Sequence, residues 1–331
     1  MIVVGLLCLL PLAGLIYQLL GHRADARNYP PPGRMMEIAG TRFHLLEKGA
    51  GDASVIFEAG IGASSVGWGL VQPRVAEFAH TYSYDRAGLG WSGPVEGART
   101  VHQSMTDLRG LLTAAGVRKP YILVGHSYGG LLVRAYATAH PTEVAGLVLV
   151  DPVAVEEWAQ PSAESLRRLR RAIRLSRRGA WLAHIGLVRL ALMRLFSGNS
   201  RLPRALAKLT SSGDANVASR LVAEVGKLPS EFWPVVKAHW SNPKCFSGMA
   251  AHLEQLPASA LSLTGLGPLP DVPVCVISAA TSTATERGER EALLRNISLG
   301  EHIVAERAGH WIQLDEPELV IDACRRMLAR G

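Results

Sequence analysis

The sequence predicts an α/β fold: a mostly parallel sheet flanked by helices, with one long helical segment inserted. Two observations predict it. Short apolar runs alternate with helical patterns from residue 34, stop near 153 and resume near 265. The run 144–150 is continuously apolar, as expected for a parallel strand buried on both faces. We therefore expect a core domain from 34–153 and 265–331, with a helical lid from 154–264.

The elements of the core follow in chain order. An antiparallel hairpin is expected where two extended stretches flank Ala39-Gly40, and Gly116 and Pro141 are expected to end the two helices of the first core segment. The expected strands are 35–38, 41–47, 55–58, 81–84, 121–124, 144–150, 272–277 and 303–304, and the expected core helices are 100–115, 129–140 and 316–328. A helical block inserted late in such a sheet should cover its carboxyl edge, where open α/β sheets bind ligands.

Composition limits the class of protein. The chain has 331 residues, of which 48% are hydrophobic and 19% charged. That is enough apolar material for a sizeable core, and it excludes disordered, collagen-like and disulfide-scaffold proteins. Four cysteines without a Cys-x-x-Cys pair predict buried free thiols rather than a disulfide framework or a zinc site. No metal and no organic cofactor is implied.

Residues 1–20 form an apolar run without a charged side chain, followed by a proline-containing linker at 21–33. Twenty residues in a helix cover roughly 30 Å, the thickness of a hydrocarbon core. The run predicts a single-pass membrane anchor, and a cleaved signal peptide is the alternative. Because arginines follow the run and none precedes it, the folded domain is expected on the cytoplasmic side.

The strongest motif is Gly125-His126-Ser127-Tyr128-Gly129, which lies between a predicted strand and a predicted helix. The glycines suit a sharp turn that leaves no room for side chains beside the serine. Such a turn exposes the serine at the positive end of the helix. Ser127 is therefore the candidate nucleophile, and a structural turn serine is the alternative.

With this motif, with Asp85-Arg86-Ala87-Gly88-Leu89-Gly90-Trp91-Ser92 and with Gly309-His310-Trp311, the sequence resembles the α/β-hydrolase superfamily from about residue 33 to residue 330. It looks most like bacterial lid-bearing serine hydrolases, of the esterase and lipase type, with an N-terminal hydrophobic segment. The resemblance implies the α/β-hydrolase fold and a Ser-His-acid triad. A serine nucleophile speaks against the dehalogenase and epoxide-hydrolase chemistries of this fold, which use a carboxylate.

Serine needs a base at neutral pH, and His310 is the candidate because it follows the last predicted strand, where the superfamily places its histidine. The acid is less clearly marked. The superfamily usually supplies it after the strand that ends at Ile277, but no Asp follows there. Asp151, at the end of the preceding strand, is the preferred acid. Glu286 and the absence of any protein acid remain as alternatives.

An oxyanion formed on attack needs preorganised N–H donors. The resemblance implies the N–H of Tyr128, directly after the nucleophile, and a second N–H from the loop after the strand that ends at Glu58. Ala59-Gly60-Ile61 occupies that loop, so Ile61 is the candidate. Asp85-Arg86 is expected to form a structural ion pair that braces these loops.

The expected lid carries much of the positive charge. Residues 166–178 contain seven arginines, and the formal net charge of the chain is +7. A basic helix beside an apolar one suits an anionic lipid surface, and a solvated lid face is the alternative. Nucleic acid is not expected, because no recognised binding motif accompanies the cluster.

Together these features predict a membrane-tethered serine hydrolase that cleaves carboxylic esters of small, apolar substrates. Two alternatives remain: an amidase or aminopeptidase with the same triad, and a non-catalytic hydrolase-like receptor for a small ligand.

Overall fold

The computed structural model describes residues 2–196 and 224–330, without the side chains of residues 2–10. Eight strands form one sheet in the order β1-β2-β4-β3-β5-β6-β7-β8. Only β2 runs antiparallel to its neighbours β1 and β4; the other neighbouring strands are parallel. The predicted α/β class and its mostly parallel sheet are confirmed.

The strand bounds agree closely with the expected ones, except at the edge of the sheet. The strands are β1 Arg34–Ile38, β2 Thr41–Lys48, β3 Ser54–Glu58, β4 His80–Tyr84, β5 Tyr121–His126, β6 Val144–Val150, β7 Val274–Ala279 and β8 Gly300–Ala305. Strand β8 is longer than the expected 303–304 because it pairs with β7 along its whole length. It lies at the edge and is only partly buried, and its first three residues are Gly300, Glu301 and His302, which give no apolar signal.

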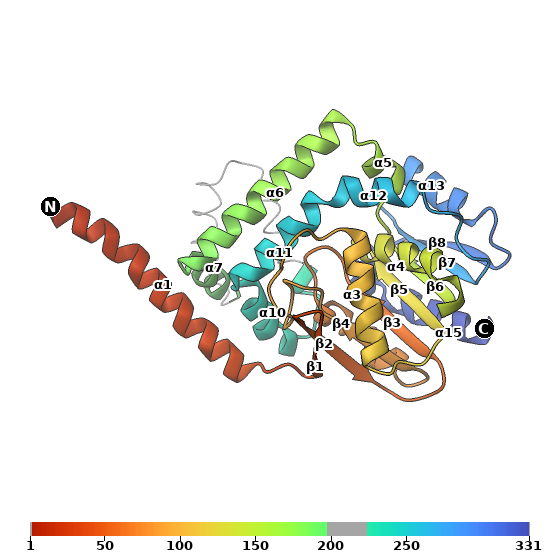
Figure 1. Cartoon of the computed structure of the whole chain (residues 1–331), viewed down its shortest axis with the longest axis horizontal. Coiled ribbons are helices and arrows are strands. Elements are labelled where there is room, and N and C mark those ends of the chain that lie inside the picture. The colour runs from red at the N-terminus through yellow and green to blue at the C-terminus, as the bar shows by residue number, and fades with distance from the viewer. Residues whose placement is uncertain (1, 197–223, 331) are drawn as a thin grey trace.

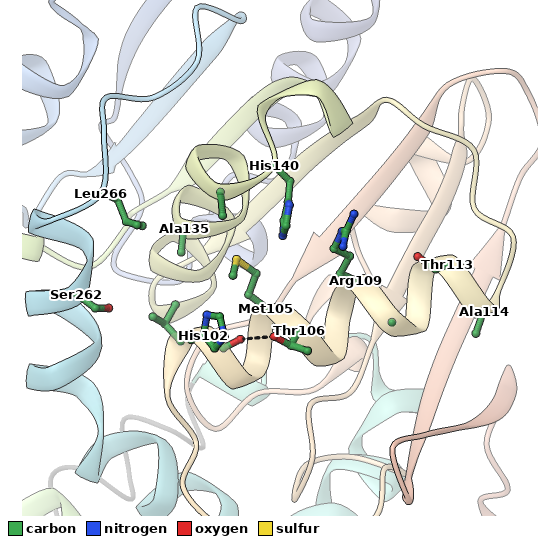
Figure 2. Close-up of a pocket in the computed structure, with 13 residues that line it drawn as sticks. His102, Met105, Thr106, Arg109, Thr113, Ala114, Ala135, His140, Ser262 and Leu266 are labelled. Carbon is green, nitrogen blue, oxygen red and sulfur yellow. Dashed lines mark hydrogen bonds between the residues drawn. The ribbon is translucent and has the colours of Figure 1, made fainter.

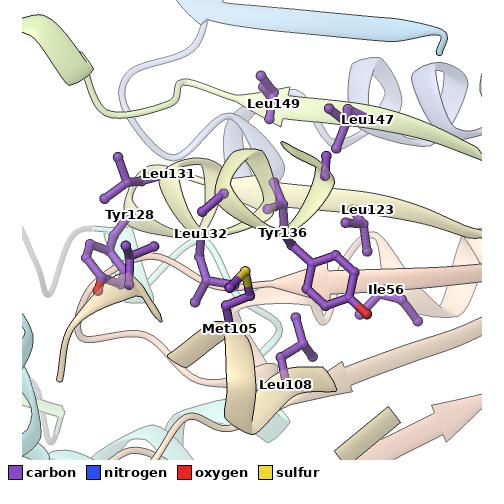
Figure 3. Close-up of a cluster of buried hydrophobic side chains, with 14 of the residues drawn as sticks. Ile56, Met105, Leu108, Leu123, Tyr128, Leu131, Leu132, Tyr136, Leu147 and Leu149 are labelled. Carbon is purple, nitrogen blue, oxygen red and sulfur yellow. The ribbon is translucent and has the colours of Figure 1, made fainter. Parts of the chain in front are cut away.

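Helices cover both faces of the sheet (Figure 1). On one face, α3 (Val101–Ala114) and α4 (Tyr128–Ala139) enclose the larger buried cluster, in which Met105 and Leu108 face Leu132 and Tyr136 (Figure 3). On the other face, α2 (Gln72–Val75) and α15 (Pro317–Arg330) contribute to a second cluster. Short elements complete the core: η1 Ser65–Trp68, η2 Pro141–Glu143, α13 Ala284–Leu294 and α14 Ile312–Asp315.

In the described part of the segment between β6 and β7 there are helices joined by loops and no strand. This part includes all of the expected lid except residues 197–223, which lie outside the described residues. Its elements are α5 Val155–Ala159, α6 Ala163–His184, α7 Leu187–Phe196, η3 Ser230–Phe232, α10 Trp233–Trp240, α11 Pro243–Glu254 and α12 Leu256–Thr264. Helix α6 packs along α11, where Gly179 lies directly against the Phe246 ring.

The N-terminal helix α1 (Ile2–Asn28) extends away from the core past α6 and α7 (Figure 1). It includes the expected anchor and most of the expected linker, although the side chains of the first ten residues lie outside the described part. Within the stretches whose side chains are described, no single helix is long and apolar enough to cross a membrane. Helices α6 and α7 together have the length and composition of a membrane-spanning segment, but the pair is bent by 93° where the two helices meet.

Candidate active site

Ser127 lies on a sharp turn between β5 and α4, as the motif predicts. Its backbone adopts φ 54° and ψ −116°, a conformation that a non-glycine residue rarely takes. The flanking positions must be glycine because the backbone around them leaves no room for a Cβ atom. A Cβ on Gly125 would lie 2.5 Å from the carbonyl oxygen of Gly129, and a Cβ on Gly129 would lie 2.3 Å from that of Glu58. The local sequence therefore holds the serine at the end of a buried strand in a strained turn.

The structure brings Ser127, His310 and Asp151 into one hydrogen-bonded row. His310 Nε2 lies 2.9 Å from Ser127 Oγ, and His310 Nδ1 lies 2.6 Å from Asp151 Oδ2. A carboxylate can only accept, so Nδ1 carries the proton and Nε2 accepts from the serine hydroxyl. This is the tautomer that a general base for the serine requires.

Asp151 directly follows β6, and its N–H donates to the carbonyl of Ile277 on β7 at 2.7 Å. Its second oxygen, Oδ1, accepts from the backbone N–H of Ala279 at 3.0 Å, from Ser282 Oγ at 2.9 Å and from Arg290 Nη1 at 2.8 Å. Burial raises the pKa of Asp151. The hydrogen bond from His310 and the charge of Arg290 outweigh burial and hold this pKa well below its usual range.

Arg290 is a site residue that the sequence analysis missed. It is buried on α13 and also donates to Ser278 Oγ and to the carbonyl of Pro152. Helix α13 itself was not expected, although its start carries a readable signal. Thr283 and Glu286 form a reciprocal capping box, the Ser/Thr-x-x-Glu pattern of a helix N-terminus.

Glu286, the alternative acid, is occupied by this cap. Its carboxylate accepts from the N–H and the hydroxyl of Thr283, at 2.7 and 2.9 Å. It lines the same cavity as His310, but the carboxylate bonded to His310 belongs to Asp151. Of the two acids considered, the structure brings Asp151 to the histidine.

His126, beside the nucleophile, connects two loops of the site. Its Nε2–H donates to the backbone carbonyl of His310 at 2.8 Å, and its ring lies 4.8 Å from the His310 ring. Burial and the neighbouring His310 lower the pKa of His126 to about 3, so the ring is neutral. This contact could not be predicted from the local sequence, because it joins residues 184 positions apart.

Of the residues that carry the expected oxyanion donors, Tyr128 directly follows Ser127, and Ile61 follows Gly60, which lies beside Ser127. A Cβ on Gly60 would be 3.6 Å from Ser127 Cβ, and the carbonyl of Gly60 accepts from Arg86 Nη2 at 2.6 Å. Because the C=O and N–H of a trans peptide point in opposite directions, the N–H of Ile61 faces away from Arg86. Tyr128 is the first residue of α4, so its N–H has no acceptor within the helix.

Asp85 and Arg86 both brace these loops, but each does so with a different partner. Arg86 is ion-paired with buried Glu58, at the end of β3, whereas Asp85 Oδ2 lies 2.9 Å from His44 Nδ1. Asp85 also accepts from the N–H of Ser65 at 2.7 Å. The expected ion pair of Asp85 with Arg86 is therefore replaced by two separate pairs, because the two side chains point to opposite sides of their strand end.

A cavity of about 370 Å³ opens beside His310 and Asp151. Its wall is mixed, because eight of the fourteen lining residues are apolar and four charged residues besides Asp151 also line it. The apolar lining includes Trp158, Leu169, Ala172, Leu253 and Leu256, and the charged groups are Glu157, Arg168, Glu286 and Arg290. In the described part of the chain, no cluster of three or more His, Cys, Asp or Glu could hold a metal ion.

A larger cavity of about 780 Å³ lies elsewhere, between α3, α4 and α12 (Figure 2). Met105, Ala135 and Leu266 line it, and Arg109 and His140 lie near each other on its wall (Figure 2). Neither Ser127 nor His310 contributes to its wall. Volume alone therefore does not identify the reactive site, and the hydrogen-bonded row of Ser127, His310 and Asp151 does so better.

Comparison with known proteins agrees with this geometry. The model of the alpha/beta hydrolase family matches residues 55–323. The uncharacterized protein YqjL of Bacillus subtilis (strain 168) is 38% identical over 116 residues, which are 35% of this chain and 46% of the relative. A haloalkane dehalogenase of Mycolicibacterium smegmatis is 31% identical over 135 residues, 39% of this chain and 43% of the relative. The chain thus spans less than half the length of either relative.

Among solved structures, a thermophilic esterase from Thermogutta terrifontis superposes with a TM-score of 0.61 at 21% identity, covering 89% of this chain and 96% of the esterase. A likeness at this level of identity shows the fold alone. The family match covers most of the chain, including the turn at Ser127, Asp151 and His310. The chain therefore belongs to the alpha/beta hydrolase family.

Proposed function

We propose that this protein is a serine hydrolase that cleaves carboxylic esters. The observation that carries the proposal is the hydrogen-bonded row from Ser127 Oγ through His310 to Asp151 Oδ2, with distances of 2.9 and 2.6 Å. Ser127 is the nucleophile, His310 the general base and Asp151 the acid that orients the imidazole. The N–H groups of Ile61 and Tyr128 form the oxyanion hole.

In the proposed reaction Ser127 Oγ attacks the ester carbonyl carbon while its proton passes to His310 Nε2. The carbonyl oxygen becomes an oxyanion that accepts hydrogen bonds from the two backbone N–H groups. His310 then protonates the leaving alcohol, which departs and leaves an acyl group on the serine. A water molecule then attacks this acyl group while His310 Nε2 takes one of its protons. The bond from the acyl carbon to Ser127 Oγ breaks, His310 returns the proton to Oγ, and the carboxylic acid departs.

The cavity beside His310 supports a small, apolar ester as the substrate. The side chains of Trp158, Leu169 and Leu256 offer apolar surface to the hydrocarbon portion of such a substrate. Amide substrates would use the same triad, and a receptor would keep the cavity without turnover. These two alternatives are outcomes of the experiments below.

We also propose that α1 tethers the enzyme to a membrane as a single-pass anchor, with the hydrolase domain on the cytoplasmic side. The support is that, over residues 11–20, α1 turns a small and a polar residue toward the protein and apolar side chains outward. Gly14, Gln18, Gly21 and Asp25 recur at helical spacing and meet the lid, where Arg189 bonds to Gln18 at 3.0 Å and to Asp25 at 2.6 Å. The outward side chains are half-exposed and apolar: Leu12, Leu15, Ile16, Leu19 and Leu20. A helix that dissolves in water has the opposite arrangement.

A fluorophosphonate probe tests the nucleophile, because it labels only an activated serine. We expect the full chain to be labelled and to hydrolyse short-chain esters, and Ser127→Ala to lose both properties while keeping the wild-type circular dichroism spectrum. Ser176→Ala, which removes another buried serine hydroxyl, is the matched control. Labelling of a folded Ser127→Ala protein would refute the assignment. Labelling of the wild type without turnover of esters or amides would favour the receptor alternative.

The anchor is tested separately by washing membranes with alkaline carbonate. The full chain should stay in the membrane fraction. A mature protein that begins near Arg27 would show instead that the apolar run is a cleaved signal peptide.

A further inference from the structure

The exposed side of α6 is a nearly continuous row of arginines. The helix buries Leu169, Ser176, Gly179 and Ala183 toward the rest of the lid. Its opposite side is exposed and basic. The exposed arginines of α6 are Arg167, Arg168, Arg170, Arg171, Arg174, Arg177 and Arg178. Glu157 pairs with Arg168 and Glu254 with Arg177. Residues 166–178 contain seven arginines and no acidic residue, so the segment itself is strongly basic.

A large aromatic side chain ends this row. Trp181 lies on the arginine side of α6 and is 63% exposed. Leu187 and Met193, on α7 directly after it, are also exposed. Exposed tryptophan between a basic and an apolar surface is typical of the boundary between lipid headgroups and acyl chains.

The contact with α1 fixes where this boundary lies. The turn between α6 and α7 approaches α1 so closely that a Cβ on Gly14 would be 2.3 Å from the carbonyl oxygen of Ile185. Gly14 is inside the apolar run, so the exposed Leu15 and Leu19 lie beside the lid rather than beyond it. The N-terminal part of α1 continues past α6, on the side away from the core (Figure 1). An inserted α1 would therefore bring the Trp181 end of α6 to the membrane surface.

We propose that the exposed arginine face of α6 binds the headgroups of an anionic bilayer, so that the lid rests on the leaflet from which the anchor emerges. Charge complementarity selects the occupant, because guanidinium groups pair with phosphate and the leaflet is an extended anionic surface. This inference rests on the proposed anchoring by α1, but not on the proposed chemistry. It places the lid of the hydrolase at the source of apolar, membrane-dissolved substrates.

The test compares the full chain on two kinds of vesicle, one of phosphatidylcholine alone and one of phosphatidylcholine mixed with phosphatidylglycerol. Flotation measures the partition coefficient on each. The anchor should give binding to both, and the α6 face should add binding to the anionic vesicles that is lost at high salt. The triple variant Arg170→Gln, Arg174→Gln, Arg178→Gln should lose this addition, by about fivefold per arginine and about 100-fold in total.

The matched control is Arg118→Gln, Arg307→Gln, Arg325→Gln, which removes the same charge from exposed arginines elsewhere. It should keep most of the preference for anionic vesicles. Equal partition of the wild type between the two vesicles would overturn the proposal, as would an equal loss in both triple variants. Binding to anionic vesicles without binding to neutral ones would instead refute the anchor and leave the α6 face supported.

Trp181 gives a second, independent readout. In the full chain on anionic vesicles, lipids brominated near the headgroup should quench part of the tryptophan fluorescence, and Trp181→Phe should remove that part. Trp158→Phe, inside the cavity, is the control and should leave the quenching unchanged. Quenching that persists in Trp181→Phe, or a face that binds duplex DNA but no vesicle, would also overturn the proposal.

Discussion

Replacing Arg290 by methionine tests how the acid of the proposed triad is held. Arg290 contacts Oδ1 of Asp151 at 2.8 Å, whereas His310 contacts Oδ2 at 2.6 Å. A fixed positive charge thus lies on the far side of the carboxylate from the histidine. When His310 takes up the serine proton, two cations share one anion. Arg290 therefore positions Asp151 and at the same time opposes the charge that develops on His310.

The size of this effect follows from the geometry. Two unit charges about 7 Å apart, across one carboxylate, interact by roughly 2 kcal/mol at an effective dielectric constant of about 20. Removing Arg290 removes that repulsion and makes the protonated imidazole easier to form. The acid limb of the kcat/KM profile should therefore move to higher pH. The free energy of unfolding should fall by about 3 kcal/mol, since a buried ion pair is broken.

The assay is the pH dependence of ester hydrolysis for the wild type, Arg290→Met, Arg290→Lys and Arg287→Met. Arg287 lies on the same helix but donates to the carbonyl of Ala280 at 2.8 Å, so its variant should keep the wild-type profile. Lysine should restore the profile at least partly, because it restores the charge. Glu157, Arg168 and Glu286 also face the cavity and are the same in all variants. A folded Arg290→Met protein with the wild-type acid limb would refute the reasoning.

Three further changes have distinct expected outcomes. Asp151→Asn should lower kcat by orders of magnitude, about 10⁴ in the serine protease case, with little change in KM. Glu286→Gln should change kcat little. Steady-state kinetics that showed similar losses of kcat in both variants would contradict the assignment of Asp151 as the acid. Arg86→Met leaves Glu58 buried without its cation, so denaturant titration should show that the free energy of unfolding falls by about 3–5 kcal/mol. A fall of less than about 1 kcal/mol would contradict a structural role for this ion pair. Arg109, whose hydrogen bond is the largest cause, lowers the pKa of Glu143 to about 2 against the effect of burial. The stabilisation by this carboxylate is complete above its unfolded pKa and is lost as pH falls toward 2. Glu143→Gln should therefore be less stable than the wild type by about 1–3 kcal/mol at pH 7. In thermal melts the stabilities of the two proteins should converge near pH 2.

Local patterns were sufficient for most of the core. The continuous apolar run of β6 and the apolar spacing of α3 each reflect burial of the residues concerned, so the sequence predicts them directly. Helix α13 escaped prediction because it is largely charged and buries only Arg290 among its residues. Strand β8 was predicted too short for a related reason: at the edge of the sheet, hydrogen bonds to β7 define the strand more than apolar side chains do.

The same distinction applies to the candidate site. Ser127 could be predicted because its turn requires glycines at fixed neighbouring positions. His310 could be placed by its position after the last strand. The choice between Asp151 and Glu286 could not be made locally, since it depends on which side chain reaches a histidine far along the chain. The role of Arg290 could not be predicted from the sequence, because it depends on a contact with Asp151, a residue 139 positions away.

The row from Ser127 to His310 joins residues 183 positions apart. On the ribosome the serine turn is therefore complete long before its histidine exists. At about 5–20 residues per second, roughly 10–40 s separate the synthesis of the two. A nascent chain would thus carry Ser127 without its base for this interval, and a chain cut short before residue 310 would never acquire the base. The long separation in sequence delays the chemistry until the whole hydrolase domain can fold.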